Sequence, residues 1–136
     1  MADLDGGELE RTALFRSELR RFLHRTELLA AEAGLTPQRY DLLLQLKAAG
    51  SSTVTELAEL LHLRQTAVTE LVKRAQEAGL VRRRRSSDDG RVFVLELTQL
   101  GEKRLLQVYD ALRRERSALL SAFEELDASF RASTRS

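Results

Sequence analysis

The alternation of apolar and polar residues predicts helices over most of the chain. From Glu8 to about Ala33 there is no glycine or proline, and apolar side chains recur at the spacing of one helix face. This pattern predicts a long first helix that ends at Gly34. Thr36 and the proline after it are typical of the start of a second helix, which is expected to end at Gly50. Its expected inward residues are Tyr40, Leu43, Leu44 and Leu46.

The stretch from Thr53 to Leu97 begins with two short helices. The pair Thr53 and Glu56 fits a capping box at the start of the first helix, and a tight turn at residues 62–64 leads to the second, which Gly79 ends. Two helices joined so tightly form a helix-turn-helix. The expected inward residues are Leu57, Leu60, Leu61, Val68, Leu71, Val72 and Ala75, and the expected outward residues of the second helix are Gln65, Thr66, Thr69, Glu70 and Lys73.

A basic hairpin follows the helix-turn-helix. Residues 82–85 and 92–97 have strand character and bracket Ser-Ser-Asp-Asp-Gly, in which Asp-Gly is typical of a hairpin turn. Residues 51–54 end in a β-branched residue, so they are a candidate for one further strand. Helix, turn, helix and hairpin together predict a winged helix.

Amphipathic helix is predicted again after the hairpin. Thr98 is expected to cap it, and a second capping box from Ser121 to Glu124 predicts a break before a last helix that ends near Phe130. Apolar helix surface that a small domain cannot bury is usually covered by a partner, and a second copy of the chain is the economical one. The apolar stripe comprises Leu105, Tyr109, Leu112, Leu119 and Phe123.

Length and composition argue against several classes of function. The 136 residues suffice for one domain, no apolar run is long enough to span a bilayer, and the N-terminus lacks the features of a signal peptide, so we expect a cytoplasmic protein without a membrane partner. No cysteine is present, and His24 and His62 have no companion at metal-ligand spacing. We therefore expect no metal site, no cofactor, no catalytic residues and no enzymatic activity.

The charge distribution is uneven although the whole chain carries only +1. Residues 64–91 contain eight basic and four acidic side chains, a net charge of +4, which leaves −3 for the rest. A positive footprint confined to the helix-turn-helix and its hairpin indicates contact with phosphate groups.

Short motifs occur along nearly the whole chain in the order and spacing of a known family. They are Leu35-Thr36-Pro37-x-x-Tyr40, Thr53-Val54-Thr55-Glu56-Leu57-Ala58, Ala67-Val68-Thr69, Glu77-Ala78-Gly79-Leu80-Val81, Asp88-Asp89-Gly90-Arg91 and Leu97-Thr98-x-x-Gly101. In these motifs the chain resembles the MarR/SlyA family of bacterial transcriptional regulators. The resemblance implies an obligate homodimer that binds palindromic double-stranded DNA, is commonly released by a small aromatic or phenolic ligand, and is not an enzyme.

The expected fold class is mainly α with a small β-hairpin wing, a winged helix-turn-helix with N- and C-terminal dimerisation helices. Its expected parts are a disordered N-terminus at 1–7, a dimerisation helix at 8–35, a winged helix-turn-helix DNA-binding region at 36–98, C-terminal dimerisation helices at 99–132 and a tail at 133–136. The expected dimerisation residues are Phe15, Leu19, Phe22, Leu119 and Phe123.

The resemblance implies that a recognition helix at about residues 65–78 enters the major groove, where Gln can read adenine and Thr can contact a thymine methyl group. Arg91 matches the family's arginine that enters the minor groove, and Asp89 matches the acid that orients it. Side chains alternate along a strand, so about two of the four arginines at 82–85 are expected to reach phosphates. The expected DNA-binding residues are Arg64, Gln65, Thr66, Thr69, Lys73, Arg82, Arg84, Asp89 and Arg91.

Two positions depart from the family's pattern. Arg64 stands where a small polar N-cap is usual, which removes a cap worth about 1 kcal/mol and places a charge next to DNA. Glu70 stands where a basic residue is frequent, and an acid facing the groove reduces the attraction to phosphate unless it accepts from a cytosine amine. The operator sequence therefore does not carry over from relatives.

An effector pocket is also implied by the resemblance, between the second helix, the fifth helix and the partner's first helix. The alternative for its two tyrosines is interior packing with satisfied hydroxyl groups. Two alternatives to a ligand-responsive repressor stay open: a winged-helix module that binds proteins, and a constitutive DNA-binding protein without an effector. The candidate effector-binding residues are Tyr40, Tyr109, Arg20, Arg21 and His24.

Overall fold

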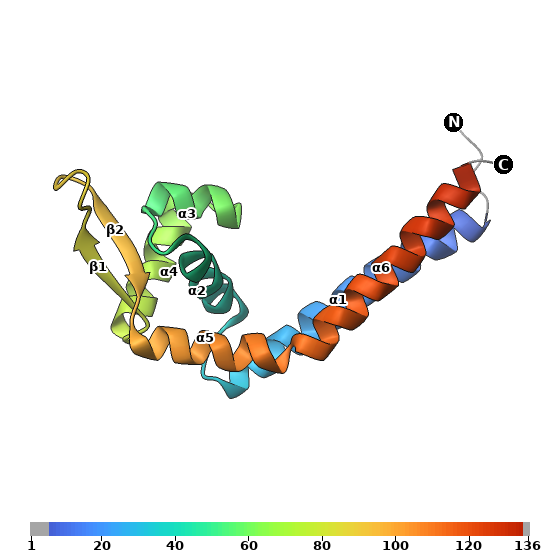
Figure 1. Cartoon of the computed structure of the whole chain (residues 1–136), viewed down its shortest axis with the longest axis horizontal. Helices are drawn as coiled ribbons and strands as arrows, with labels where there is room; N and C mark the ends of the chain where they lie inside the picture. The colour runs from blue at the N-terminus through green and yellow to red at the C-terminus, as the bar shows by residue number, and fades with distance from the viewer. Residues whose placement is uncertain (1–5, 135–136) are drawn as a thin grey trace. The chain divides into compact units, whose positions relative to one another are not determined.

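The computed structural model describes residues 6–134, which divide into two units (Figure 1). Residues 30–110 form one compact unit, here called the winged unit. The segments 6–29 and 111–134 form the other, here called the flanking unit. No helix within the described residues is both long and apolar enough to cross a lipid bilayer.

The winged unit contains helices and one hairpin in the predicted order. The strands β1 and β2 pair antiparallel, with Val81 opposite Leu97 at the base and Arg85 opposite Phe93 at the tip. This arrangement confirms the expected fold class, a mainly helical winged helix-turn-helix. The elements are α2 (Pro37–Ala49), α3 (Val54–Leu61), α4 (Gln65–Glu77), β1 (Val81–Arg85), β2 (Phe93–Leu97) and α5 (Gln99–Ala111).

Three threonines start helices of the winged unit as the sequence predicts. The Thr36 hydroxyl accepts the Arg39 N–H at 3.1 Å. Thr53 and Glu56 form the complete capping box, with both hydrogen bonds at 3.1 Å. The Thr98 hydroxyl accepts the Gly101 N–H at 3.0 Å and donates to the Gly79 carbonyl at 2.6 Å. These local hydrogen bonds set the start of α2, α3 and α5, because they satisfy N–H groups that the helix itself leaves unpaired.

The core of the winged unit confirms the inward residues of α4 and corrects α3. Leu57 and Ala58 are buried on α3, whereas Leu60 is 47% exposed. Side chains advance by about 100° per residue around a helix, which places Leu60 beyond the edge of the face that Leu57 and Ala58 share. Leu42 of α2 was not among the residues expected to face inward, but it is fully buried. The buried residues of α4 are Val68, Leu71, Val72 and Ala75.

The strand expected at residues 51–54 does not form. Ser52 alone bridges to β2: its N–H donates to the Leu95 carbonyl at 3.0 Å, and its own carbonyl accepts the Leu95 N–H at 2.7 Å. Thr53 already caps α3 and Val54 is its first helical residue. The capping box therefore ends the extended segment before a third strand can develop.

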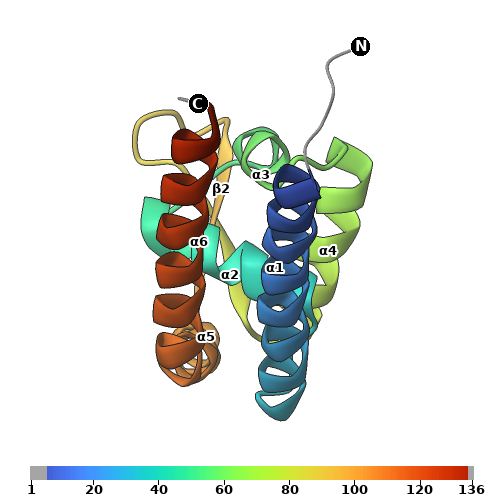
Figure 2. The same cartoon turned by 90° about the vertical axis from the view of Figure 1, so that its right-hand side faces the viewer.

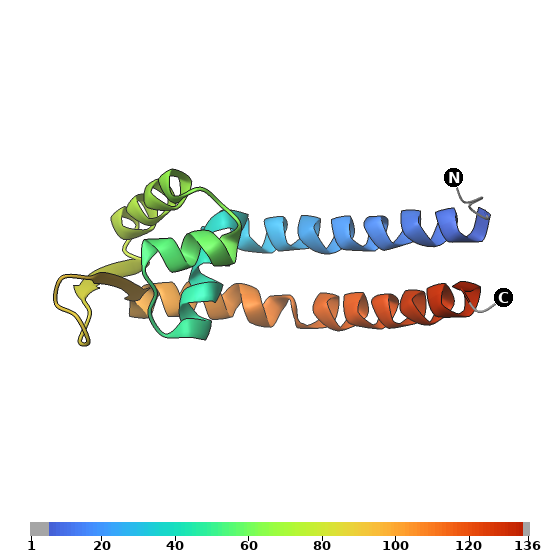
Figure 3. The ribbon, with the colours of Figure 1, turned by 90° about the horizontal axis from the view of Figure 1, so that it is seen from above.

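The flanking unit consists of most of α1 (Gly6–Glu32) together with α6 (Arg113–Thr134), which run antiparallel (Figures 2 and 3). Phe15 of α1 stacks on Phe123 of α6 with ring centroids 4.7 Å apart. Helix α1 begins at Gly6, so Gly6 and Gly7 do not belong to the expected disordered N-terminus. Glu8 in the first turn favours this start because it complements the helix dipole. Residues 1–5, and 135–136 of the expected tail, lie outside the described residues.

The helix break expected at Ser121 to Glu124 is absent from α6, which is continuous over this segment. A turn at Leu112 separates α5 from α6 instead. Phe123 stacks on Phe15 and Leu126 is buried, so the apolar face of α6 continues in phase past Ser121. Packing against α1 thus overrides the local capping signal.

Candidate nucleic-acid interface

Helix α4 presents a polar face opposite its buried one. The side chains expected to face outward are all exposed, and four of them, Gln65, Thr66, Thr69 and Lys73, were assigned to DNA. Arg64 is the N-cap residue and makes no side-chain capping bond, as its departure from a small polar residue predicts. The helix start therefore keeps unpaired N–H groups next to an exposed cation, a combination that attracts anions.

A groove of about 580 Å³ runs between α4 and the hairpin. Three of the predicted base-reading residues line it, namely Gln65, Thr69 and Lys73. The Gln65 amide donates to the Thr55 hydroxyl at 3.2 Å, which orients the amide toward the start of α3. The structure thus brings together side chains with donors, acceptors and positive charge on one face of the winged unit.

The strand arginines that the sequence assigned to DNA are ion-paired in the structure. Arg82 Nε donates to Glu96 at 2.6 Å, and Arg84 Nε donates to the other oxygen of the same carboxylate at 2.8 Å. The hydrogen bonds from Arg84 and Arg82 hold the pKa of Glu96 below its usual value. Arg82 lines a different hollow, together with Lys47 and Glu102, which form an ion pair of their own. These two arginines therefore lie on the opposite face of β1 from the groove beside α4.

The other two arginines of β1 lie over an aromatic ring. The guanidinium carbons of Arg83 and Arg85 lie 4.2 and 5.3 Å from the centroid of Phe93. Phe93 is opposite Arg85 in the register and 41% exposed. Both Arg83 and Phe93 line the groove beside α4. The sequence reasoning missed this pair, although strand alternation and an aromatic residue opposite position 85 were the available signal.

At the wing tip, Asp89 contacts Arg91 differently from the expectation. The Asp89 carboxylate accepts the main-chain N–H of Arg91 at 3.0 Å, which fixes the turn. Between residues 6 and 134, the structure gives the Arg91 guanidinium no carboxylate partner, so Asp89 does not orient it directly. Asp89 shapes the loop, and the exposed Arg91 side chain extends from it.

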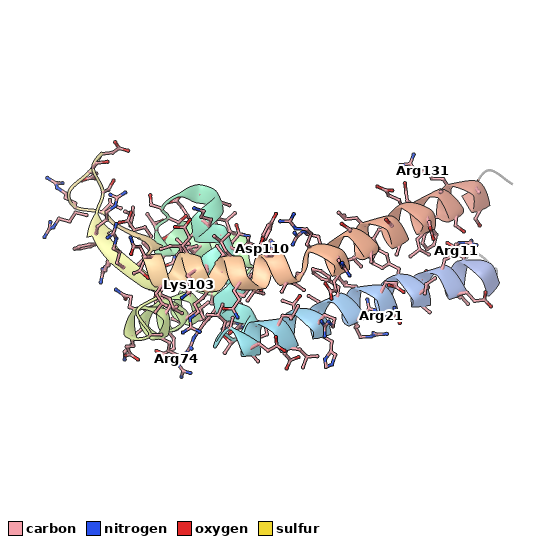
Figure 4. All side chains as sticks on the ribbon, turned by 60° about the horizontal axis from the view of Figure 1, so that its bottom comes forward. Arg11, Arg21, Arg74, Lys103, Asp110 and Arg131 are labelled. Carbon is pink, nitrogen blue, oxygen red and sulfur yellow. The ribbon has the colours of Figure 1, made fainter. Side chains whose placement is uncertain are left out.

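Glu70, the acidic departure on α4, pairs with Arg74 one turn later at 3.1 Å. Both side chains are exposed, and Figure 4 shows Arg74 projecting outward from α4. The ion pair compensates the acidic charge within the helix. Glu70 therefore neutralises the positive charge of Arg74 on the face of α4, and its own carboxylate is paired there.

The predicted effector-binding residues are divided between the two units. Tyr40 of the winged unit is buried, with 5% exposure, whereas Tyr109 is 38% exposed. Arg20, Arg21 and His24 are exposed on α1 in the flanking unit, and Figure 4 shows Arg21 projecting from that helix. The flanking unit holds a hollow of about 90 Å³ beside Arg21, Arg25 and Glu115. The predicted pocket includes the partner's first helix, so the role of these residues in effector binding stays a prediction.

Some of the predicted dimerisation residues pack within the chain. Phe15 and Phe123 stack on each other, and Leu19, Phe22 and Leu119 are partly buried. The apolar side chains that the flanking unit leaves most exposed are different ones: Leu9, Leu14, Leu23, Leu28 and Leu120, with 44–58% exposure. The role of the five predicted residues in dimerisation stays a prediction.

Residues 33–92 match a family model, MarR_2, that is described as the MarR family. The repressor MdtR of Bacillus subtilis (strain 168), described as an HTH-type transcriptional repressor, is 35% identical over 75 residues, which are 55% of this chain and 48% of MdtR. The chain thus spans about half the length of the curated relatives it matches.

Solved structures match over nearly the whole chain. The YusO protein from Bacillus subtilis is 28% identical with a TM-score of 0.60, and the match covers 93% of this chain and 89% of YusO. A mutant MarR from E. coli, solved in complex with operator DNA, is 18% identical with a TM-score of 0.70 over 95% of this chain and 99% of that one. At that identity the second likeness shows the fold alone.

Proposed function

We propose that this chain, whose residues 33–92 match the MarR family, is a homodimeric transcriptional regulator that binds a palindromic DNA operator and acts as a repressor. The observation that carries the proposal is the groove in which α4 presents Gln65, Thr69 and Lys73 beside the wing. Donors, acceptors and positive charge on an exposed helix are what major-groove recognition requires. The net charge of +4 over residues 64–91 supports contact with phosphates.

Release of DNA by a small aromatic or phenolic ligand belongs to the same proposal. Tyr109 is the better candidate of the two tyrosines for contact with such a ligand, because its side chain is exposed and that of Tyr40 is buried. A ligand releases the operator only if it binds better to a conformation that DNA does not fit.

Substitution of Arg91 tests DNA binding by the wing. We expect Arg91→Ala to weaken operator binding by about 1 to 3 kcal/mol and to flatten the slope of log K against log salt by about one unit, because one cation no longer displaces a counterion. Fluorescence titrations between about 50 and 200 mM salt measure both quantities. Circular dichroism should match wild type, since the side chain is exposed.

Two results would count against the proposal. Wild-type protein whose affinity for duplex does not change with salt would contradict DNA binding and favour the protein-interaction alternative. Unchanged affinity of Arg91→Ala would contradict only the role of the wing tip.

A second test concerns the homodimer. Leu23 and Leu120 are 55% and 58% exposed on the flanking unit, and exposed apolar surface is a candidate for contact with a partner. We expect Leu23→Asp with Leu120→Asp to weaken the dimer by at least about 2 kcal/mol, because two charges would be buried in an apolar contact. Sedimentation velocity measures the dissociation. Leu60→Asp, at an exposed leucine of α3, is the matched control that should stay dimeric.

A further inference from the structure

Strand β1 divides its four arginines into two pairs with different partners. Arg82 and Arg84 share the carboxylate of Glu96 on one face. Arg83 and Arg85 lie over the ring of Phe93 on the other face. We call Arg83 and Arg85 the ring pair. The division follows from strand alternation, because neighbouring side chains point to opposite faces.

The two kinds of partner have opposite effects on the charge that DNA would meet. The Glu96 carboxylate offsets one of the two positive charges of Arg82 and Arg84 and accepts the Nε–H of each, whereas an aromatic ring beneath a guanidinium leaves the whole charge and the N–H groups at its edge available. Arg85 uses one N–H for the Gly90 carbonyl, at 2.8 Å, and a guanidinium has five. Within the described part of the chain, neither member of the ring pair has a carboxylate partner.

The ring pair also lies on the face where it can contact DNA. Arg83 and Phe93 line the groove together with Thr69 and Lys73 of α4, while Arg82 lines the hollow on the far side of the hairpin. Phe93 is 41% exposed, although an apolar ring at a strand position beside Leu95 would ordinarily join the core. In the structure this exposed ring contacts the guanidinium groups of Arg83 and Arg85.

We propose that Phe93 is a positioning residue that holds Arg83 and Arg85 as a phosphate-binding pair for the DNA backbone beside the recognition helix, while Glu96 withholds Arg82 and Arg84. This inference rests on the proposed function, DNA binding by the winged unit. The sequence suggested Arg82 and Arg84 as the arginines that contact DNA, whereas this proposal assigns the contact to the ring pair. The ring already restricts the rotation of the two long arginine side chains. They therefore lose less conformational entropy when they bind phosphate.

The first experiment compares Arg83→Gln with Arg84→Gln on one labelled duplex, between about 50 and 200 mM salt. The two variants lose the same charge at neighbouring positions, and in Arg84→Gln the carboxylate of Glu96 keeps Arg82 as its partner. We expect Arg83→Gln to flatten the salt slope by about 0.9, the value for one phosphate contact. Arg84→Gln should leave the slope at its wild-type value.

The second experiment tests positioning by the ring. Phe93→Leu keeps an apolar side chain but removes the ring, and it should weaken binding about 2- to 5-fold, the worth of an exposed cation–π contact. Phe93→Tyr keeps the ring and should bind as wild type does. In the background of Arg83→Gln with Arg85→Gln, Phe93→Leu should have no further effect, because the residues that the ring positions are absent.

The outcomes separate this inference from the proposed function. If wild-type protein binds no duplex in a salt-dependent way, DNA binding itself is overturned. If wild type binds and the two arginine variants have equal slopes, the ring pair is overturned while DNA binding stands. If Phe93→Leu has the same effect with and without Arg83 and Arg85, the ring acts on its own and the positioning role is overturned.

Discussion

Gly101→Ala is expected to lower the free energy of unfolding by about 3 kcal/mol, the upper part of the range for overpacked sites. A Cβ atom on residue 101 would lie 2.0 Å from the Leu80 carbonyl oxygen and 3.0 Å from its carbon. Both atoms belong to the backbone, so no side-chain rotation relieves the clash. The direction of this change in stability is informative, because alanine in a helix is otherwise favoured over glycine by about 1 kcal/mol.

The contact at Gly101 joins the start of α5 to the base of the hairpin. The Leu80 carbonyl also accepts the Thr98 N–H at 3.1 Å, and Thr98 in turn caps α5. Moving α5 away from Leu80 therefore breaks hydrogen bonds as well as packing. Urea unfolding followed by circular dichroism measures the change. Gly90→Ala is the matched control: a Cβ there meets no atom within 4 Å, so equal losses for both variants would contradict this explanation.

Leu57→Ala is the other substitution with a large expected effect, a loss of about 3 kcal/mol of folding free energy. Leu57 is fully buried on α3, and truncation leaves a cavity that its neighbours fill only in part. Helix α3 has eight residues and makes its contacts with α2 and α4. Loss of this side chain therefore loosens the support of α4, and we expect DNA affinity to fall together with stability.

Leu60 on the same helix is the control for Leu57. It is 47% exposed, so Leu60→Ala should change stability by no more than about 0.5 kcal/mol. Thermal unfolding of both variants measures the difference. Similar losses for the two substitutions would mean that Leu60 is buried in solution and would contradict this explanation.

Much of the fold was predictable because its signals are local. Thr36, Thr53 and Thr98 each cap a helix through a hydroxyl group within three residues of the N–H it accepts. Gly34, Gly50 and Gly79 have positive φ angles where the sequence placed helix ends. Such features depend on a few neighbouring residues, so they can be inferred without knowledge of the rest of the chain.

The sequence was less informative where two distant segments compete for a side chain. Strand alternation predicted that only two of four arginines could share a face, but Glu96 and Phe93, on the opposite strand, determined which two. In the same way Phe15 and Phe123 fitted an apolar stripe, and only the antiparallel packing of α1 on α6 shows that they contact each other.

By itself, then, the sequence determined the order of helices, their caps, the basic hairpin and the outward face of α4, all of which follow from residues close together in the chain. The tertiary structure alone decided which two arginines of β1 pair with Glu96, that Leu60 is exposed, that α6 continues past Ser121, and that Gly101 must approach Leu80. The physical reason is that packing, ion pairing and close backbone contact depend on the distance between segments, and that distance is set only when the whole chain has folded.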